Sequence, residues 1–195
     1  SGFTYTYDAN GNQTGKTDKA TSAHTGFSYD TENRLIHAEM PDGMAGSYQY
    51  DALGRRVERI VSTGTTTTFR YIYDGADILA MLNASNSAAA VFTHDLGIAS
   101  PRIMHKADGT DYFYHADAIG SVVALTDSGG AIAERVEYGS YGKPTFIDAR
   151  GPPQTSSRSF TGNPFTYTPL VLDDETGLFK PVWRTYDPVT GRFPQ

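Results

Sequence analysis

The amino-acid sequence predicts an all-β protein, a curved and largely antiparallel meander of β-hairpins. The dipeptide Tyr-Asp starts at residues 7, 29, 50 and 73, and these steps of 22, 21 and 23 residues indicate an internal repeat. Thirteen Tyr and ten Phe, with twenty Gly and ten Pro, are typical of half-buried strands joined by tight turns. No ten-residue stretch shows the helical period of about 3.6 residues.

Each repeat contains a strand, a turn and a returning strand. Alternating residues precede the dipeptide, as in Phe3-Thr4-Tyr5-Thr6-Tyr7. The Asp opens a stretch that ends in Gly or Asn three positions later, as from Asp30 to Asn33. The Asp carboxylate can open a type I turn by accepting hydrogen bonds from backbone N–H groups. Gly or Asn can then take the left-handed position that closes a three-residue hairpin loop.

Weaker copies of the repeat continue the pattern. They stand at His94-Asp95, at His115 with Asp117 two places later and at Tyr138-Gly139, and a further Tyr-Asp dipeptide stands at Tyr186-Asp187. Further hairpins are predicted over residues 71–82, 101–114 and 122–136, with one short helical turn over residues 117–120. In total we expect about 10–14 short strands.

The chain is predicted to be a single region, residues 1–195, without a domain boundary. Hairpin repeats occupy residues 1–142, a Pro- and Ser-rich loop occupies residues 143–158, and a terminal segment occupies residues 159–195. The formal net charge of -6 and the lack of a basic block predict that nucleic acid is not a partner. No apolar run approaches the ~18 residues of a membrane span, no signal peptide opens the chain, and no Cys is present.

Several motifs together resemble the YD-repeat, or Rhs-repeat, family. Two of them are Tyr29-Asp30-Thr31-Glu32-Asn33-Arg34-Leu35 and Tyr50-Asp51-Ala52-Leu53-Gly54-Arg55-Arg56. The C-terminal runs Leu172-Asp173-Asp174-Glu175-Thr176-Gly177-Leu178 and Tyr186-Asp187-Pro188-Val189-Thr190-Gly191-Arg192-Phe193 resemble the terminal core signature of the family. The stretch from Pro169 to Trp183 departs from the family pattern, and Pro181 there predicts a sheet edge or a bulge.

The resemblance implies a segment of a spiral β-shell, or cocoon, that encloses a variable C-terminal toxin. Such shells occur in bacterial polymorphic toxins and in the C components of insecticidal toxin complexes, and related repeats occur in animal teneurins. It further implies the effector cargo and the remainder of the shell as partners, with delivery-system proteins as further candidates. The location would be secreted or cell-surface, and cytoplasmic before export.

Acidic side chains are the first candidates for chemistry. The Asp residues of the repeats could bind calcium, but calcium needs about 6–8 converging oxygens and each turn supplies one carboxylate, so turn formation is the better interpretation. The one acidic cluster comprises Asp173, Asp174, Glu175 and Asp187. Paired carboxylates could serve acid–base or glycosidase chemistry, whereas turn formation explains them without a cleft.

The remaining candidates are weaker. The five histidines, His24, His37, His94, His105 and His115, show no metal-ligand spacing, and His94 and His115 are expected to replace a tyrosine ring in the sheet. No nucleophile elbow or phosphate loop is present in the sequence. We therefore predict no catalytic, cofactor-binding or metal-binding residue, no cofactor and no enzymatic activity.

Two functions remain open at this point, and a self-cleaving enzyme is a third and least favoured alternative. A row of tyrosines could line the inside of a shell, or it could face solvent and bind glycans or a partner protein as an adhesion module. Packing of the rings within the sheet is the simpler interpretation for any single Tyr. The function predicted first is structural encapsulation of a C-terminal effector, and the alternative is a cell-surface binding module.

Overall fold

The computed structural model describes residues 2–96, 100–152, 154–168, 170–181 and 184–195, whose regular structure consists of β-strands. This confirms the predicted all-β class. None of the described residues form a helix that could cross a membrane. The strands are β1 Phe3–Tyr7, β2 Gln13–Asp18, β3 His24–Tyr29, β4 Leu35–Glu39, β5 Ala45–Tyr50, β6 Arg56–Ser62, β7 Thr66–Asp74, β8 Asp77–Leu82, β9 Ala88–His94, β10 Pro101–Lys106, β11 Asp111–Ala116, β12 Val122–Thr126, β13 Ile132–Tyr138, β14 Pro144–Asp148, β15 Gln154–Ser156, β16 Val171–Asp173 and β17 Leu178–Lys180.

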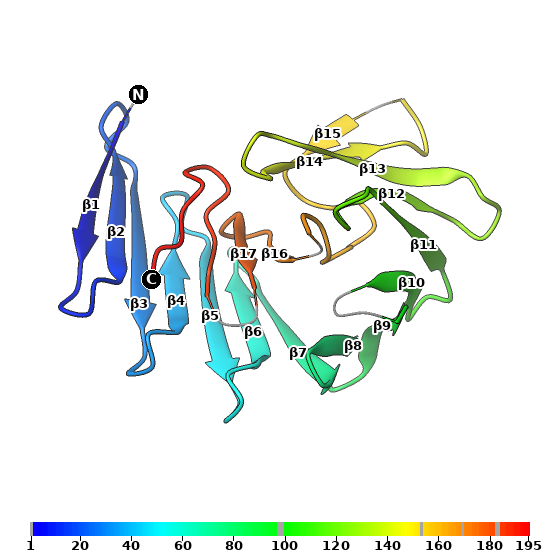
Figure 1. Cartoon of the computed structure of the whole chain (residues 1–195), viewed down its shortest axis with the longest axis horizontal. Coiled ribbons are helices and arrows are strands. Elements are labelled where there is room, and N and C mark those ends of the chain that lie inside the picture. The colour runs from blue at the N-terminus through cyan, green and yellow to red at the C-terminus, as the bar shows by residue number, and fades with distance from the viewer. Residues whose placement is uncertain (1, 97–99, 153, 169, 182–183) are drawn as a thin grey trace.

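Strands β1 to β15 form one antiparallel sheet in which the order in space is the order in sequence. We call this sheet the wall. The register shifts by one residue near the end of several strands, for example between Gln49 and Tyr50 and between Ile72 and Tyr73. Such bulges bend a strand and increase its twist, which accounts for the arc that the wall describes in Figure 1.

The hairpin turns have the predicted chemistry. The carboxylate of Asp30 accepts hydrogen bonds from the backbone N–H groups of Glu32 and Arg34, both at 2.9 Å. Asn33 then takes a left-handed conformation with φ of 61°, and its backbone N–H closes the turn on the Asp30 carbonyl. The turns opened by Asp8, Asp51, Asp117 and Asp127 repeat this pattern, and each has a glycine at the left-handed position.

The tyrosine of the repeat connects neighbouring strands. The Tyr29 hydroxyl donates to the carbonyl of Gln13, where the preceding strand begins, at 3.0 Å. The same bond joins Tyr50 to Leu35, Tyr73 to Arg56 and Tyr138 to Val122, at 2.7, 2.8 and 2.6 Å. The repeat therefore combines a turn-forming Asp with a Tyr that binds the adjacent strand through its hydroxyl.

The two histidines predicted to replace this tyrosine differ. His94 does so, because its Nε2 lies 2.8 Å from the Ile78 carbonyl in the equivalent geometry. The prediction for His115 is wrong. The His115 ring is exposed and contacts Thr126. The position of the repeat tyrosine belongs to the residue directly before the turn-opening Asp, which here is Ala116, and Ala116 pairs with Val122 at the bulge.

The predicted loop over residues 143–158 is also wrong, because this stretch contributes β14 and β15 to the wall. Pro144 stands opposite Tyr138 at the first position of β14, where a missing N–H donor is tolerated. Phe146 follows with no exposed surface, and Pro152 lies in the bend between the two strands.

Two smaller expectations also need correction. Residues 117–120 form a hairpin turn and not a helical turn, because the Asp117 carboxylate binds the N–H groups of Ile119 and Ser121 and Gly120 has φ of 86°. The described residues contain seventeen strands, more than the 10–14 expected. The excess arises mainly from the three-residue strands β15, β16 and β17, which are too short to show a period in the sequence.

The terminal segment 159–195, which we call the strap, covers the concave inner face of the wall (Figure 1). Its strands β16 and β17 form a separate hairpin, and β17 ends at Lys180, directly before Pro181. Three clusters of buried apolar side chains lie between wall and strap along the arc. The strap supplies Phe165 and Val171 to the largest cluster, Leu178 to the second, and Leu172 and Phe179 to the third.

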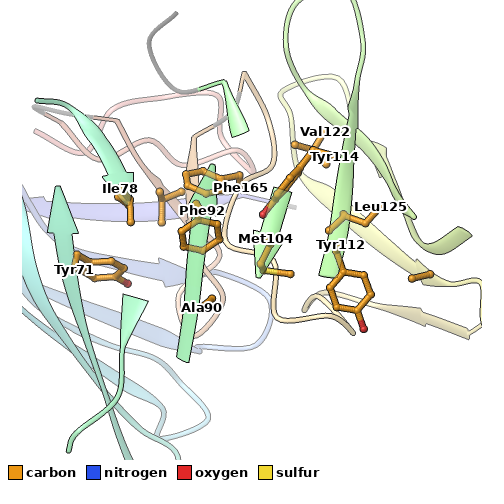
Figure 2. Packing of buried hydrophobic residues seen from close by; sticks show 12 residues of the cluster. Tyr71, Ile78, Ala90, Phe92, Met104, Tyr112, Tyr114, Val122, Leu125 and Phe165 are labelled. Carbon is orange, nitrogen blue, oxygen red and sulfur yellow. The ribbon is translucent and has the colours of Figure 1, made fainter. Parts of the chain in front are cut away.

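Phe165 illustrates this packing. Its ring meets the Phe92 ring edge-on with centroids 5.0 Å apart, and the Tyr114 ring lies 6.1 Å away (Figure 2). Edge-to-face contacts of this kind stabilise aromatic pairs by about 0.5–1.5 kcal/mol beyond area burial. The inner face of the wall is therefore half of a core that the strap completes.

We expect Tyr138→Phe to lower the free energy of unfolding by about 1–2 kcal/mol, because it leaves the carbonyl of Val122 without its donor. Urea unfolding of the purified chain measures this change. Tyr7→Phe is the matched control, since Tyr7 is 58% exposed, and it should change stability by less than about 0.5 kcal/mol. Equal effects of the two variants would contradict a structural role for the repeat hydroxyl.

Candidate functional site: a charged cluster between wall and strap

A cluster of buried charges joins the strap to the inner face of the wall. Arg56 of β6 donates from Nη1 to Oδ2 of Asp173 at 2.5 Å, and the two side chains are 4% and 2% exposed. Arg59 of the same strand pairs with Asp174 and, from Nη2 to Oε2 at 2.8 Å, with Glu175. The cluster thus brings together residues more than 110 positions apart in the chain.

Local structure positions both halves of the cluster. The backbone N–H groups of Thr176 and Gly177 bind the Asp173 carbonyl, so residues 173–177 form the tight turn of the β16–β17 hairpin. This turn directs the acidic side chains to the wall. On the wall, the Arg56 guanidinium lies over the rings of Tyr48 and Tyr71, at 5.0 and 5.6 Å from their centroids.

The predicted interpretation of the acidic cluster was therefore incomplete. Turn formation accounts for the backbone of residues 173–177, but the carboxylates are bound by arginines. Asp187, the fourth acidic residue, lies apart from the others and pairs with Lys16 of β2 at 2.8 Å. Since the side chains of Asp173 and Glu175 are 2% and 0% exposed, neither faces a cleft in which it could act on a substrate.

Burial shifts the proton equilibria within the cluster. Burial, reinforced by the charge of Asp173, raises the pKa of Glu175 to about 7, and Arg59 opposes this shift. The Tyr48 hydroxyl donates to Glu175 at 2.9 Å, and burial raises the pKa of Tyr48 above its usual value. Burial and the nearby charge of Arg56 lower the pKa of Lys180, at the end of β17, to about 7.

Glu134 of β13 makes a second polar connection. Its carboxylate has no exposed surface and accepts hydrogen bonds from the Ser159 hydroxyl at 2.8 Å and the backbone N–H of Phe160 at 2.5 Å. The Thr161 N–H adds a third donor at 3.2 Å. Burial raises the pKa of Glu134 in spite of these donors. This residue sets the path of the chain where it enters the strap, and no pattern in the sequence indicates this role.

The other candidates from the sequence do not converge on a site. His24, His37 and His105 contact Thr17, Ser47 and Asp111, their neighbours across the sheet. Within the described part of the chain, no three His, Asp or Glu side chains are grouped so that they could share a metal ion. The tyrosines Tyr48, Tyr71, Tyr112 and Tyr114 are buried within the core, which agrees with the simpler packing interpretation.

Comparison with known proteins agrees with this architecture. A profile described as the teneurin YD-shell matches residues 1–195. The chain belongs to this YD-shell family. The tRNA3(Ser)-specific nuclease WapA of Bacillus spizizenii is 29% identical over 189 residues, which are 96% of this YD-shell segment and 7% of the relative. The double-stranded DNA deaminase toxin A of Burkholderia cenocepacia is 26% identical over 219 residues, which are 97% of the segment and 15% of the relative.

Solved structures show the same fold. The Tc holotoxin pore of Photorhabdus luminescens matches with a TM-score of 0.65 and 19% identity, covering 99% of this segment and 12% of the matched chain. A crystal structure of a TcdB2–TccC3 complex matches with a TM-score of 0.61 and 19% identity, again covering 99% of this segment and 12% of the matched chain. The segment therefore has the shell-type fold, and it spans a small part of each of these relatives.

We expect Asp173→Asn to lower the free energy of unfolding of the YD-shell segment by about 3–5 kcal/mol, because it leaves Arg56 buried without its counter-charge. Urea unfolding measures the change. The control is Glu58→Gln, which removes the carboxylate paired with the partly exposed Arg70 and should cost less than about 1 kcal/mol. Similar losses in both variants would show that the buried cluster does not hold the strap.

Lys180→Met should stabilise the segment by about 1–3 kcal/mol at pH 6, because methionine fills similar space without a desolvated ammonium group. The lowered pKa means that the folded state binds this proton less tightly than the unfolded state. The destabilisation by Lys180 is therefore complete below pH 7 and disappears as the pH rises from about 7 to the ordinary value of 10.5. Unfolding free energies at several pH values test this, and a gain independent of pH would contradict it.

Proposed function

We propose that this chain is a structural element of a shell that encloses a C-terminal effector polypeptide, and that it performs no catalysis itself. The observation that carries the proposal is the inner face of the wall. Each of its three apolar clusters is completed by strap residues, so this face is built to be covered by polypeptide lying inside the arc. A wall of this kind can keep an enclosed chain away from water and proteases.

The edges of the wall support the same function. Within the described residues, β1 pairs only with β2 and β15 only with β14, so each outer strand offers a row of backbone groups for further strands. The relatives and structural neighbours are much longer and include proteins named as toxins and toxin complexes. The proposed partners are accordingly the remainder of the shell, the effector cargo and delivery-system proteins. The proposed location is outside the producing cell, after synthesis in its cytoplasm.

The alternative function, a surface binding module, is less well supported. It would need rows of tyrosine facing solvent. Tyr48, Tyr71, Tyr112 and Tyr114 instead belong to the buried apolar clusters, at most 8% exposed. This arrangement favours containment over adhesion.

Purification of the natural protein that contains this segment from its producing cells tests the proposal. We expect a C-terminal piece to co-purify and to resist protease until the shell unfolds. Asp173→Asn in that protein should make the piece sensitive to protease, whereas Glu58→Gln should not, because only the first substitution weakens the strap. A segment found free, without an enclosed piece, would contradict encapsulation and favour the binding module.

A further inference from the structure

A cavity of about 270 Å³ lies between the wall and the strap, beside the charged cluster, whose Arg59 and Asp174 form part of its lining. Its apolar part is formed by Phe69, Met81, Ala90 and Met104 of strands β7 to β10, with Leu172 of the strap opposite. For comparison, an apolar cavity of about 150 Å³ accommodates benzene. The space between wall and strap therefore suits a molecule of about ten heavy atoms.

Two of the lining side chains can adapt to a ligand. Methionine is unbranched, flexible and polarisable, and such side chains can adjust to differently shaped apolar groups. Met81 is partly buried and Met104 has no exposed surface. At the rim, the Asp174 side chain is 39% exposed, which places this part of the lining in contact with solvent.

The charges on the lining are not balanced. Asp174 is paired with Arg59, which also binds Glu175. Lys106 of β10 donates from Nζ to the Thr161 carbonyl at 2.8 Å. Among the described residues no carboxylate lies within ion-pair distance of it, and Asp108 interacts with it only at longer range. An ammonium group carries three donors, so Lys106 can donate two further hydrogen bonds.

We propose that this cavity binds a small monocarboxylate with an apolar chain or ring, whose carboxylate accepts hydrogen bonds from Lys106. The apolar body lies against Phe69, Met81 and Met104, and the carboxylate accepts a direct hydrogen bond from Lys106, whose nearest acidic neighbour in sequence, Asp108, acts on it only through a longer-range charge interaction. This ligand class follows from one cationic group beside an apolar space of limited volume. The site is independent of any enclosed effector, so it can be tested on this chain alone.

Octanoate, with ten heavy atoms, is a suitable probe. The chain contains four methionines, of which Met81 and Met104 line the cavity while Met40 and Met44 do not. In NMR spectra of the chain labelled with ¹³C at the methionine methyl groups, we expect octanoate to shift the Met81 and Met104 signals and to leave those of Met40 and Met44 unchanged. The dissociation constant should be below about 1 mM. Equal shifts at all four methyl groups, or none, would overturn the proposal.

Variants test the two parts of the site separately. Lys106→Gln should weaken octanoate binding at least tenfold and leave the binding of octan-1-ol unchanged, whereas Lys143→Gln, at an exposed lysine outside the cavity, should affect neither ligand. Ala89→Leu, which places a larger side chain at the partly buried edge of the cavity, should weaken both ligands. Unchanged Met40 and Met44 signals establish that each variant is folded. Octanoate binding that survives both Lys106→Gln and Ala89→Leu would place the ligand elsewhere and refute the site.

Discussion

The pairing of Arg56 and Arg59 with the acidic turn of the strap is the contact that holds the strap on the inner face of the wall. Burying an ion costs several kcal/mol, and a partner with good geometry is needed to offset that cost. Each half of the cluster is therefore destabilised without the other. The wall alone would carry two unpaired arginines on an apolar face, and the strap alone would carry three adjacent carboxylates that repel one another. Docking of the strap meets both requirements at once, and it places Leu172, Leu178 and Phe179 in their apolar clusters.

The wall itself is organised by local rules. The turns opened by Asp8, Asp30, Asp51, Asp117 and Asp127 are closed by an Asp carboxylate and a left-handed Gly or Asn. The repeat tyrosines Tyr29, Tyr50, Tyr73 and Tyr138 each bind the strand directly before them. Because these contacts lie within about 20 residues of each other, one repeat can be added to the next without a change in design. Bulges beside Tyr7, Tyr29, Tyr50 and Tyr73 help to bend the sheet, so the same repeat that pairs these strands also curves the wall.

The local contacts within the wall and the long-range contacts with the strap have separate roles, and both are needed for a shell that encloses polypeptide. The local contacts make a continuous sheet, and the long-range contacts decide what covers its inner face. The strap contacts this face from the second strand, where the Pro194 carbonyl accepts a hydrogen bond from the Gln13 N–H, to the fourteenth, whose Phe146 packs with Leu172 and Phe179. A wall whose inner face is built to hold polypeptide is consistent with the long toxin proteins among which its relatives are found.

The sequence by itself determined the all-β class, the repeat, the turn chemistry and the family, because each of these depends on residues close together in the chain. The tertiary structure alone decided the pairing of Asp173 with Arg56, the role of Glu134 and the position of Ala116 in place of His115. It also decided that residues 143–158 join the wall, since Phe146 is buried by strap residues that follow it in the chain. Pairing across more than 100 residues leaves no periodic pattern in the sequence. The residues of an acidic turn are the same whether their carboxylates face water or a buried arginine, so the sequence does not distinguish the two cases.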